Sequence, residues 1–179
     1  MLFNTFGNPT HKTLMLVHGL GVSYQVFTPL IAHLQERYHI IAVQVDGFLL
    51  DAEGKAIPSV FTSIYDQVDQ LVEHIRTKYD GHLDAAYGLS MGGCIVAKLQ
   101  ERTNITIDHV ILDAAPLLPL PRWSIDPLRY YQSFNVWCSY HMSGFFKWLF
   151  CSHYFDTLLA ELAKVYPSGY GRAVRDAYK

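Results

Sequence analysis

The chain has 179 residues, of which 14 are Lys or Arg and 16 are Asp or Glu, so its formal net charge is −2. The residues are 50% hydrophobic and 17% charged, which excludes an intrinsically disordered chain and supports one packed domain with a small appendage. Because the charge is nearly balanced, no extended basic surface is expected, and nucleic acid is not expected as a partner.

The first part of the chain alternates strand and helix patterns. Residues 14–17 form a continuous apolar run that stops before a glycine, which is typical of a strand buried on both faces. Apolar residues recur at helical spacing over 24–37. The β-branched residues of 39–45 predict a second strand, which ends at a turn formed by Asp46 and Gly47.

The alternation continues to residue 113. Ser63 is placed to cap a helix with apolar residues at helical spacing, and a strand over 83–87 follows it. A helix over 91–102 and a fourth strand over 107–112 complete the series. Strands and helices that alternate with short connections form parallel sheets with right-handed crossovers. The sequence therefore predicts an α/β fold with three layers and about four parallel strands.

The pattern changes near Pro116. Four prolines punctuate the chain between residues 116 and 127, and residues 123–155 contain 12 of the 25 aromatic residues without a convincing strand. We therefore expect a core over residues 1–115 and a helical, aromatic-rich segment over residues 116–179.

The clearest functional pattern is Gly88-Leu89-Ser90-Met91-Gly92, which matches G-x-S-x-G directly between the third strand and the following helix. A serine in such a tight turn adopts strained dihedrals, so the residues two before and two after it, here both glycine, must lack a Cβ. The helix that begins near Met91 would direct N–H groups toward an oxyanion. The alternative is a glycine-rich turn in which Ser90 only caps the helix.

With this motif, the strand–helix part of the chain resembles the α/β-hydrolase family of serine esterases and lipases. Residues 18–21, His-Gly-Leu-Gly, are similar to the His-Gly loop of that family. The resemblance implies that the backbone N–H groups of Leu20 and Met91 bind the oxyanion. It also implies that His18 and Gly19 set the geometry of the loop, with the His18 ring bonded to backbone groups instead of acting as the catalytic base.

Two aspartates end predicted strands. Asp113 follows the fourth strand, at the edge of the sheet where such sites form, so it is a candidate for the acid of a catalytic triad. Its other possible role is to cap or brace the segment that follows. Asp46 is expected to be part of a structural turn, because it precedes Ser90, whereas the family order is serine, acid, histidine.

The sequence does not identify a catalytic histidine. The histidines after Ser90 are His109, expected at the start of a strand, and His141 and His153 in the aromatic segment. Either the chain is a shortened form of a longer hydrolase, or His141 or His153 serves as the base. A serine without a base is a poor nucleophile, so we expect impaired activity. A shortened sheet would also expose an edge, which predicts self-association there or through the aromatic segment.

Cysteine content and short motifs bear on compartment and cofactors. Three cysteines are too few for a disulfide framework, and no signal peptide or membrane-spanning run is visible, so a cytoplasmic protein is expected. Cys138, His141, Cys151 and His153 could in principle bind zinc, but bulky aromatic residues fill the gaps between them. Because no P-loop or dinucleotide pattern is present either, we expect neither metal nor cofactor.

By this resemblance, the protein is expected to be a serine hydrolase that cleaves a small or medium carboxylic ester through an acyl-enzyme on Ser90. The segment after residue 116 would be a lid, whose aromatic residues either line an apolar pocket or only pack onto the sheet. The alternative is a non-catalytic binding protein or partner subunit that keeps the pocket without the base.

Overall fold

The computed structural model describes residues 1–51, 53 and 55–117, and also Pro127, Tyr130, Phe134 and His141. The expected lid over residues 116–179 lies almost entirely outside these residues, so the division into core and lid stays a prediction. The helices of the described residues include no candidate for a membrane-spanning segment.

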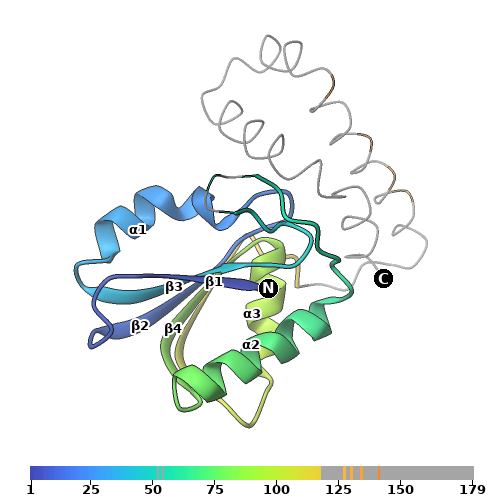
Figure 1. The fold of residues 1–179 in the computed structure, drawn as a ribbon. Coiled ribbons are helices and arrows are strands. Elements are labelled where there is room, and N and C mark those ends of the chain that lie inside the picture. Colours follow the sequence, from blue (N-terminus) through green and yellow to red (C-terminus); the bar gives the residue numbers. More distant parts are fainter. Residues whose placement is uncertain are drawn as a thin grey trace.

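Five strands form one sheet in the order β1-β3-β2-β4-β5 (Figure 1). They are β1 (Leu2–Phe6), β2 (Lys12–Val17), β3 (Tyr38–Gln44), β4 (His82–Leu89) and β5 (Thr106–Asp113). Strands β2 to β5 pair in parallel, which confirms the predicted α/β fold. Their carboxyl ends therefore share one edge of the sheet, where Val17, Leu89 and Asp113 lie.

The sheet has one strand more than the four that the sequence predicted. Strand β1 pairs antiparallel with β3, from Leu2 opposite Gln44 to Phe6 opposite Ile40. None of its residues is fully buried, as is usual for a strand at a sheet edge. Its own sequence therefore carries no clear apolar pattern, and its pairing with β3 is what makes it a strand.

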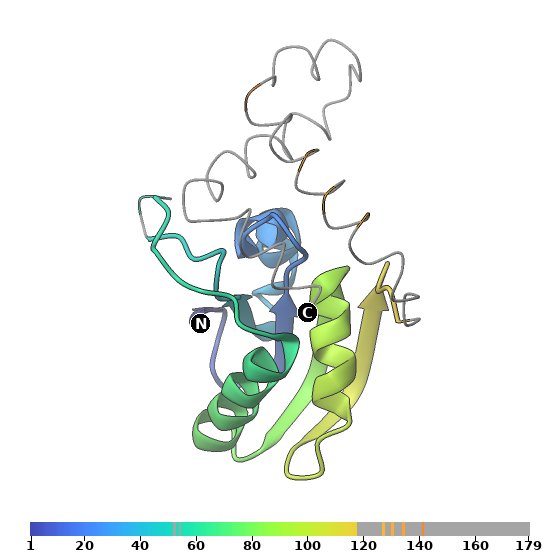
Figure 2. The same ribbon diagram turned by 90° about the vertical axis from the view of Figure 1, so that its right-hand side faces the viewer.

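Helices cover both faces of the sheet, as Figures 1 and 2 show. The 3₁₀ turn η1 (Tyr24–Phe27) and helix α1 (Thr28–Leu34) lie on one face, and α2 (Ile64–Lys78) and α3 (Met91–Gln100) lie on the other. The helix predicted over 24–37 is thus divided. Pro29 has no N–H to donate to the carbonyl of Gln25, so the 3₁₀ turn cannot continue as one α-helix.

The core lies in two layers, one on each side of the sheet. Met15 and Val17 of β2 belong to the cluster under α2 and α3, whereas Leu14 and Leu16 pack with Phe27 on the α1 side. The apolar run of β2 is continuous because helices cover both of its faces. As predicted, Ser63 caps α2: its hydroxyl accepts a hydrogen bond of 3.1 Å from the N–H of Asp66.

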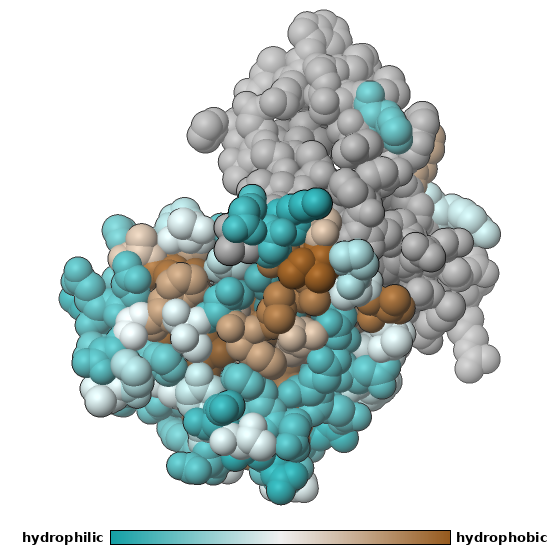
Figure 3. Space-filling view, in the orientation of Figure 1, coloured by the Kyte–Doolittle hydropathy of each residue, from teal (hydrophilic) through white to brown (hydrophobic). Residues whose placement is uncertain are grey.

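Hydrophobic residues also reach the surface. In the view of Figure 3, they gather around β1 and the loop before α2, segments in which Leu2 is 39% and Val60 is 71% exposed. On β5, the last strand of the described sheet, Ile111 is 49% exposed. Self-association through this strand stays a prediction.

Two histidines form an aromatic cluster with Tyr79 and Phe3 between β1, β3 and α2. The His74 ring stacks on Phe3 with a centroid distance of 3.5 Å, and Nε2 of His39 lies 3.2 Å from the Tyr79 hydroxyl. Nδ1 of His39 and Nε2 of His74 are buried without a hydrogen-bond partner in the described residues. Burial lowers the pKa of His39, and burial together with the charge of Lys78 lowers the pKa of His74.

We therefore expect stability to fall as pH falls below about 6.5, the ordinary histidine value. With lowered folded pKa values, the unfolded chain binds protons first, so the destabilisation starts near pH 6.5 and is complete at the lowered values. Thermal melts should show a midpoint a few degrees lower at pH 5.5 than at pH 7.5. His74→Phe keeps a ring against Phe3 but cannot titrate, so its midpoint should change less with pH. An equal change in both proteins would contradict this expectation.

Candidate active site

Ser90 occupies the one-residue turn between β4 and α3. Strand β4 ends at Leu89 and α3 begins at Met91, and Ser90 between them has φ 51° and ψ −114°. This is the left-handed side of dihedral space, which non-glycine residues rarely adopt. The Ser90 side chain makes no capping hydrogen bond to α3, so the alternative in which it only caps the helix is wrong.

The glycines beside Ser90 allow three backbone segments to meet. A Cβ on Gly92 would lie 2.2 Å from the carbonyl oxygen of Val17 and 2.6 Å from that of His18. A Cβ on Gly88 would lie 2.5 Å from the carbonyl oxygen of Gly92. These distances leave no room for a side chain. The glycine spacing is therefore what lets α3 start directly against the ends of β2 and β4.

Main-chain hydrogen bonds fix the turn on both sides. The N–H of Ser90 donates to the carbonyl oxygen of Asp113 at 2.8 Å, and the N–H of Gly93 donates to the carbonyl oxygen of Ser90 at 2.9 Å. Met91 is the first residue of α3, a position whose N–H has no acceptor within the helix. The positive end of the helix dipole lies at the same place, so this end of α3 favours a negative charge.

The loop after β2 lies beside Ser90. A Cβ built on Gly19 would be 3.3 Å from the Cβ of Ser90 and 3.3 Å from the carbonyl oxygen of Leu89. Leu20, the next residue, is half-buried and packs against the core under α2 and α3. The loop that the sequence singled out therefore does meet the serine turn, although the assignment of the Leu20 and Met91 N–H groups as oxyanion donors stays a prediction.

His18 is buried, and both nitrogens of its ring contact backbone groups. Nδ1 lies 2.8 Å from the carbonyl oxygen of Gly19, and Nε2 accepts a hydrogen bond of 3.1 Å from the N–H of Val45. Because a carbonyl can only accept and an N–H can only donate, the proton is on Nδ1. With Nε2 already accepting, the ring cannot take a proton from Ser90 without losing a buried hydrogen bond. It braces the loop after β2 against the end of β3.

Asp113 is the last residue of β5. Its main chain contacts the serine turn, and its side chain contacts Tyr87. The Tyr87 hydroxyl donates to Oδ2 of Asp113 at 2.5 Å. Burial, then the hydrogen bond to Asp113 and the charge of this residue, raise the pKa of Tyr87 to about 12. The phenol therefore stays protonated at neutral pH and donates. Sequence reasoning gave Tyr87 no role, because nothing in a strand pattern reveals a diagonal contact to the next strand.

Asp46 has a different environment. Its carboxylate binds the Met1 ammonium and accepts hydrogen bonds from the side-chain amides of Gln67 at 3.3 Å and Gln70 at 2.8 Å. Burial alone would raise the pKa of Asp46, but these hydrogen bonds and the ammonium charge hold it below the usual value. All of these partners are structural, so Asp46 connects the start of the chain, the end of β3 and α2.

Among the described residues up to 117, one histidine, His18, lies at the carboxyl edge of the sheet. His109 lies in β5 four residues before Asp113, which is about 13 Å along the strand. The other candidates for a base were His141 and His153. A role of His141 as the base stays a prediction, and His153 lies outside the described residues, as do Cys138 and Cys151 of the zinc pattern.

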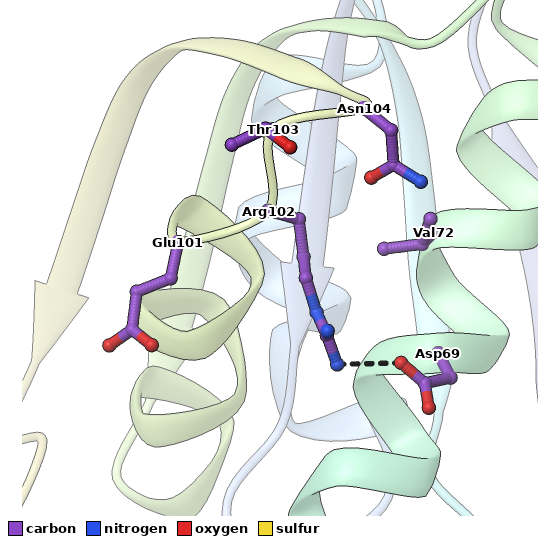
Figure 4. A pocket seen from close by; sticks show the side chains of 6 residues that line it. All are labelled: Asp69, Val72, Glu101, Arg102, Thr103 and Asn104. Atoms are coloured by element: carbon purple, nitrogen blue, oxygen red, sulfur yellow. Dashed lines mark hydrogen bonds and ion pairs between the residues drawn. The ribbon is translucent and has the colours of Figure 1, made fainter.

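A polar pocket lies at the other end of α3 (Figure 4). It is lined by Asp69, Val72, Glu101, Arg102, Thr103 and Asn104. The Arg102 guanidinium points across the pocket and binds the Asp69 carboxylate at 2.6 Å. Helix α3 has 10 residues, so about 15 Å separates this pocket from Ser90. The ion pair joins the turn after α3 to α2, and the pocket is separate from the serine turn.

Comparison with solved structures shows the same fold in hydrolases. A putative α/β-hydrolase from Desulfitobacterium hafniense is 17% identical with a TM-score of 0.74, over 99% of this chain and 72% of its own. A carboxylesterase from Nitrososphaera gargenis is 16% identical with a TM-score of 0.73, over 99% of this chain and 67% of its own. The enol-lactonase from Burkholderia xenovorans is 14% identical with a TM-score of 0.70, over 99% of this chain and 69% of its own.

No curated protein sequence matches the chain. Residues 8–159, by contrast, match the family described as serine aminopeptidase, S33. The matched range includes the loop after β2, the serine turn and β5. Because it makes up most of the chain, this match shows that the chain belongs to the S33 serine aminopeptidase family of α/β-hydrolases, and it supports a hydrolase as the general class.

Proposed function

We propose that the protein is a serine hydrolase that cleaves a small or medium carboxylic ester through an acyl-enzyme on Ser90. The observation that carries the proposal is the strained Ser90 turn at the start of α3, with Gly19 of the neighbouring loop beside it. Two of the similar structures are described as a carboxylesterase and an enol-lactonase, which supports an ester as substrate. The family description alone would equally suggest an amide.

In this reaction the Ser90 oxygen attacks the ester carbonyl, and its proton passes to a general base. The negative charge that develops on the carbonyl oxygen is stabilised by the N–H groups of Leu20 and Met91 and by the dipole of α3. The tetrahedral intermediate collapses, and the alcohol leaves with a proton. Water then attacks the acyl-enzyme and releases the acid. Asp113 is the proposed acid that would orient the base, since it ends β5 next to Ser90.

A fluorophosphonate probe tests the nucleophile directly, because it phosphonylates an activated serine. We expect labelling of the 179-residue chain at a single residue, identified as Ser90 by mass mapping of tryptic peptides. Turnover of p-nitrophenyl acetate and longer p-nitrophenyl esters then tests the substrate class. Slow turnover with clear labelling is the expected result for a chain whose base is inefficient. Labelling at another serine, or none at Ser90, would contradict the proposal.

The second candidate is a non-catalytic binding protein. It is favoured by one observation: in residues 1–117 the histidine at the carboxyl edge, His18, already uses both ring nitrogens on backbone groups. A binding protein would show saturable binding of an ester or acid in calorimetry without labelling of Ser90. The hydrolase would show labelling whether or not its turnover is fast, so the two experiments together separate the candidates.

A further inference from the structure

Two strained residues meet at the carboxyl edge of the sheet. The described residues contain three non-glycine residues with positive φ, namely Asp80, Ser90 at 51° and Ala114 at 49°. The N–H of Ser90 donates a hydrogen bond to the carbonyl oxygen of Asp113. This carbonyl belongs to the peptide bond between Asp113 and Ala114, so the two strained residues lie on either side of one hydrogen bond. Such conformations persist only where the surrounding structure determines them strongly, and they concentrate at functional sites.

Asp113 is held on both its main chain and its side chain. Its carbonyl oxygen receives the Ser90 N–H at 2.8 Å, and its carboxylate receives the Tyr87 hydroxyl at 2.5 Å. A hydrogen bond to an ionised acceptor is about twice as strong as one between neutral groups. Tyr87 reaches Asp113 diagonally across the sheet, since its direct partner on β5 is Ile111.

The Tyr87 ring is itself fixed. It meets Phe27 edge to face, with ring centroids 5.6 Å apart and planes at 87°. Phe27 is 5% exposed and belongs to the cluster on the α1 face of the sheet. The Tyr87 ring is therefore anchored in the core, and its hydroxyl binds Asp113, the last residue of β5. The main chain of Asp113 contacts Ser90.

We propose that Tyr87 is a positioning residue: its hydroxyl holds Asp113, and the carbonyl of Asp113 holds the N–H of Ser90 in the strained turn. The catalytic consequence of this arrangement rests on the proposed function, because a nucleophile must be placed within a fraction of an ångström to react. A displacement of about 1 Å can lower a rate by about 100-fold. Tyr87 does not touch the reacting atoms and acts only through Asp113.

The test is Tyr87→Phe in the full chain, which keeps the ring and its contact with Phe27 but removes the hydroxyl. We expect two changes: a shifted backbone amide resonance of Ser90 in ¹⁵N–¹H NMR spectra, and fluorophosphonate labelling of Ser90 slowed by about tenfold. The matched control is Tyr79→Phe, which removes the hydroxyl that contacts His39 at 3.2 Å, outside the serine turn. It should change neither the Ser90 resonance nor the labelling rate.

A second variant tests the pathway through Asp113. Asp113→Asn removes the charge, so the pKa of Tyr87 should fall from about 12 toward the ordinary value near 10, which ¹³C NMR of ring-labelled tyrosine can follow. Asp113→Ala removes every acceptor for the Tyr87 hydroxyl, so if Tyr87 acts through Asp113, Tyr87→Phe combined with Asp113→Ala should label no more slowly than Asp113→Ala alone. An unchanged Ser90 resonance and labelling rate in Tyr87→Phe would overturn the proposal. If the unaltered chain is not labelled, the hydrolase function fails, but the Ser90 resonance still decides the role of Tyr87.

Discussion

Replacement of Gly92 by alanine is expected to destabilise the protein by about 3 kcal/mol or more, which would lower its melting midpoint by roughly 10 °C. The added Cβ would lie 2.2 Å from the carbonyl oxygen of Val17 and 2.6 Å from that of His18. Both obstacles are backbone atoms at the end of β2, and β2 is paired on both sides, with β3 and β4. The strand cannot move aside without breaking the middle of the sheet.

Gly81→Ala is the control for the Gly92 variant. Gly81 has φ 77°, but a Cβ there would find its nearest neighbour, the carbonyl oxygen of Asn104, at 3.6 Å. The substitution therefore adds backbone strain without a collision and should cost about 1–2 kcal/mol. Thermal and urea denaturation of both variants measure the difference. Equal losses in the two proteins would mean that the close approach of α3 to β2 has no energetic importance.

Replacement of Ser90 should separate activity from stability. Both Ser90→Ala and Ser90→Gly remove the nucleophile, so probe labelling should disappear and the slow ester turnover of the unaltered chain should fall to the uncatalysed rate. Alanine must still adopt the strained conformation of φ 51° and ψ −114°, whereas glycine adopts it readily. The glycine variant is therefore expected to be about 1 kcal/mol more stable than the alanine variant.

Melting curves of the two Ser90 variants provide the measurement of strain. Since neither protein carries a hydroxyl, their difference depends on the backbone conformation at position 90 and not on lost chemistry. A more stable alanine variant would show that the turn is not strained in solution. Residual labelling in either variant would show that the probe reacts elsewhere, and the assignment of the nucleophile would then be wrong.

The parts of the fold that depend on local sequence could be predicted. The apolar run of β2 indicates burial on both faces, and the spacing of Gly88 and Gly92 around Ser90 indicates the tight turn, because each pattern reflects a constraint within a few residues. Strand β1 could not be predicted in this way. Its residues are only half-buried, and its conformation follows from pairing with β3, nearly 40 residues later.

The candidate site also has parts that local sequence predicts and parts that it does not. The turn at Ser90 and the loop at His18 and Gly19 are local motifs, so the sequence reveals them. The contact between Tyr87 and Asp113 joins residues that are 26 positions apart, and it depends on the register of β4 against β5. Single-sequence patterns do not contain that register. A general base is equally hard to find, since it has only to lie near Ser90 in space.

Main-chain groups make up much of this site, which affects how far the sequences of relatives can differ. The turn is fixed by the carbonyl of Asp113, by the carbonyls of Val17 and His18 against Gly92, and by the N–H of Val45 on the His18 ring. Every residue has a main-chain carbonyl and every residue except proline has an N–H, so apart from the glycines and the His18 ring these contacts require no particular side chain. Proteins that share fewer than one residue in five with this chain can thereby retain the same architecture.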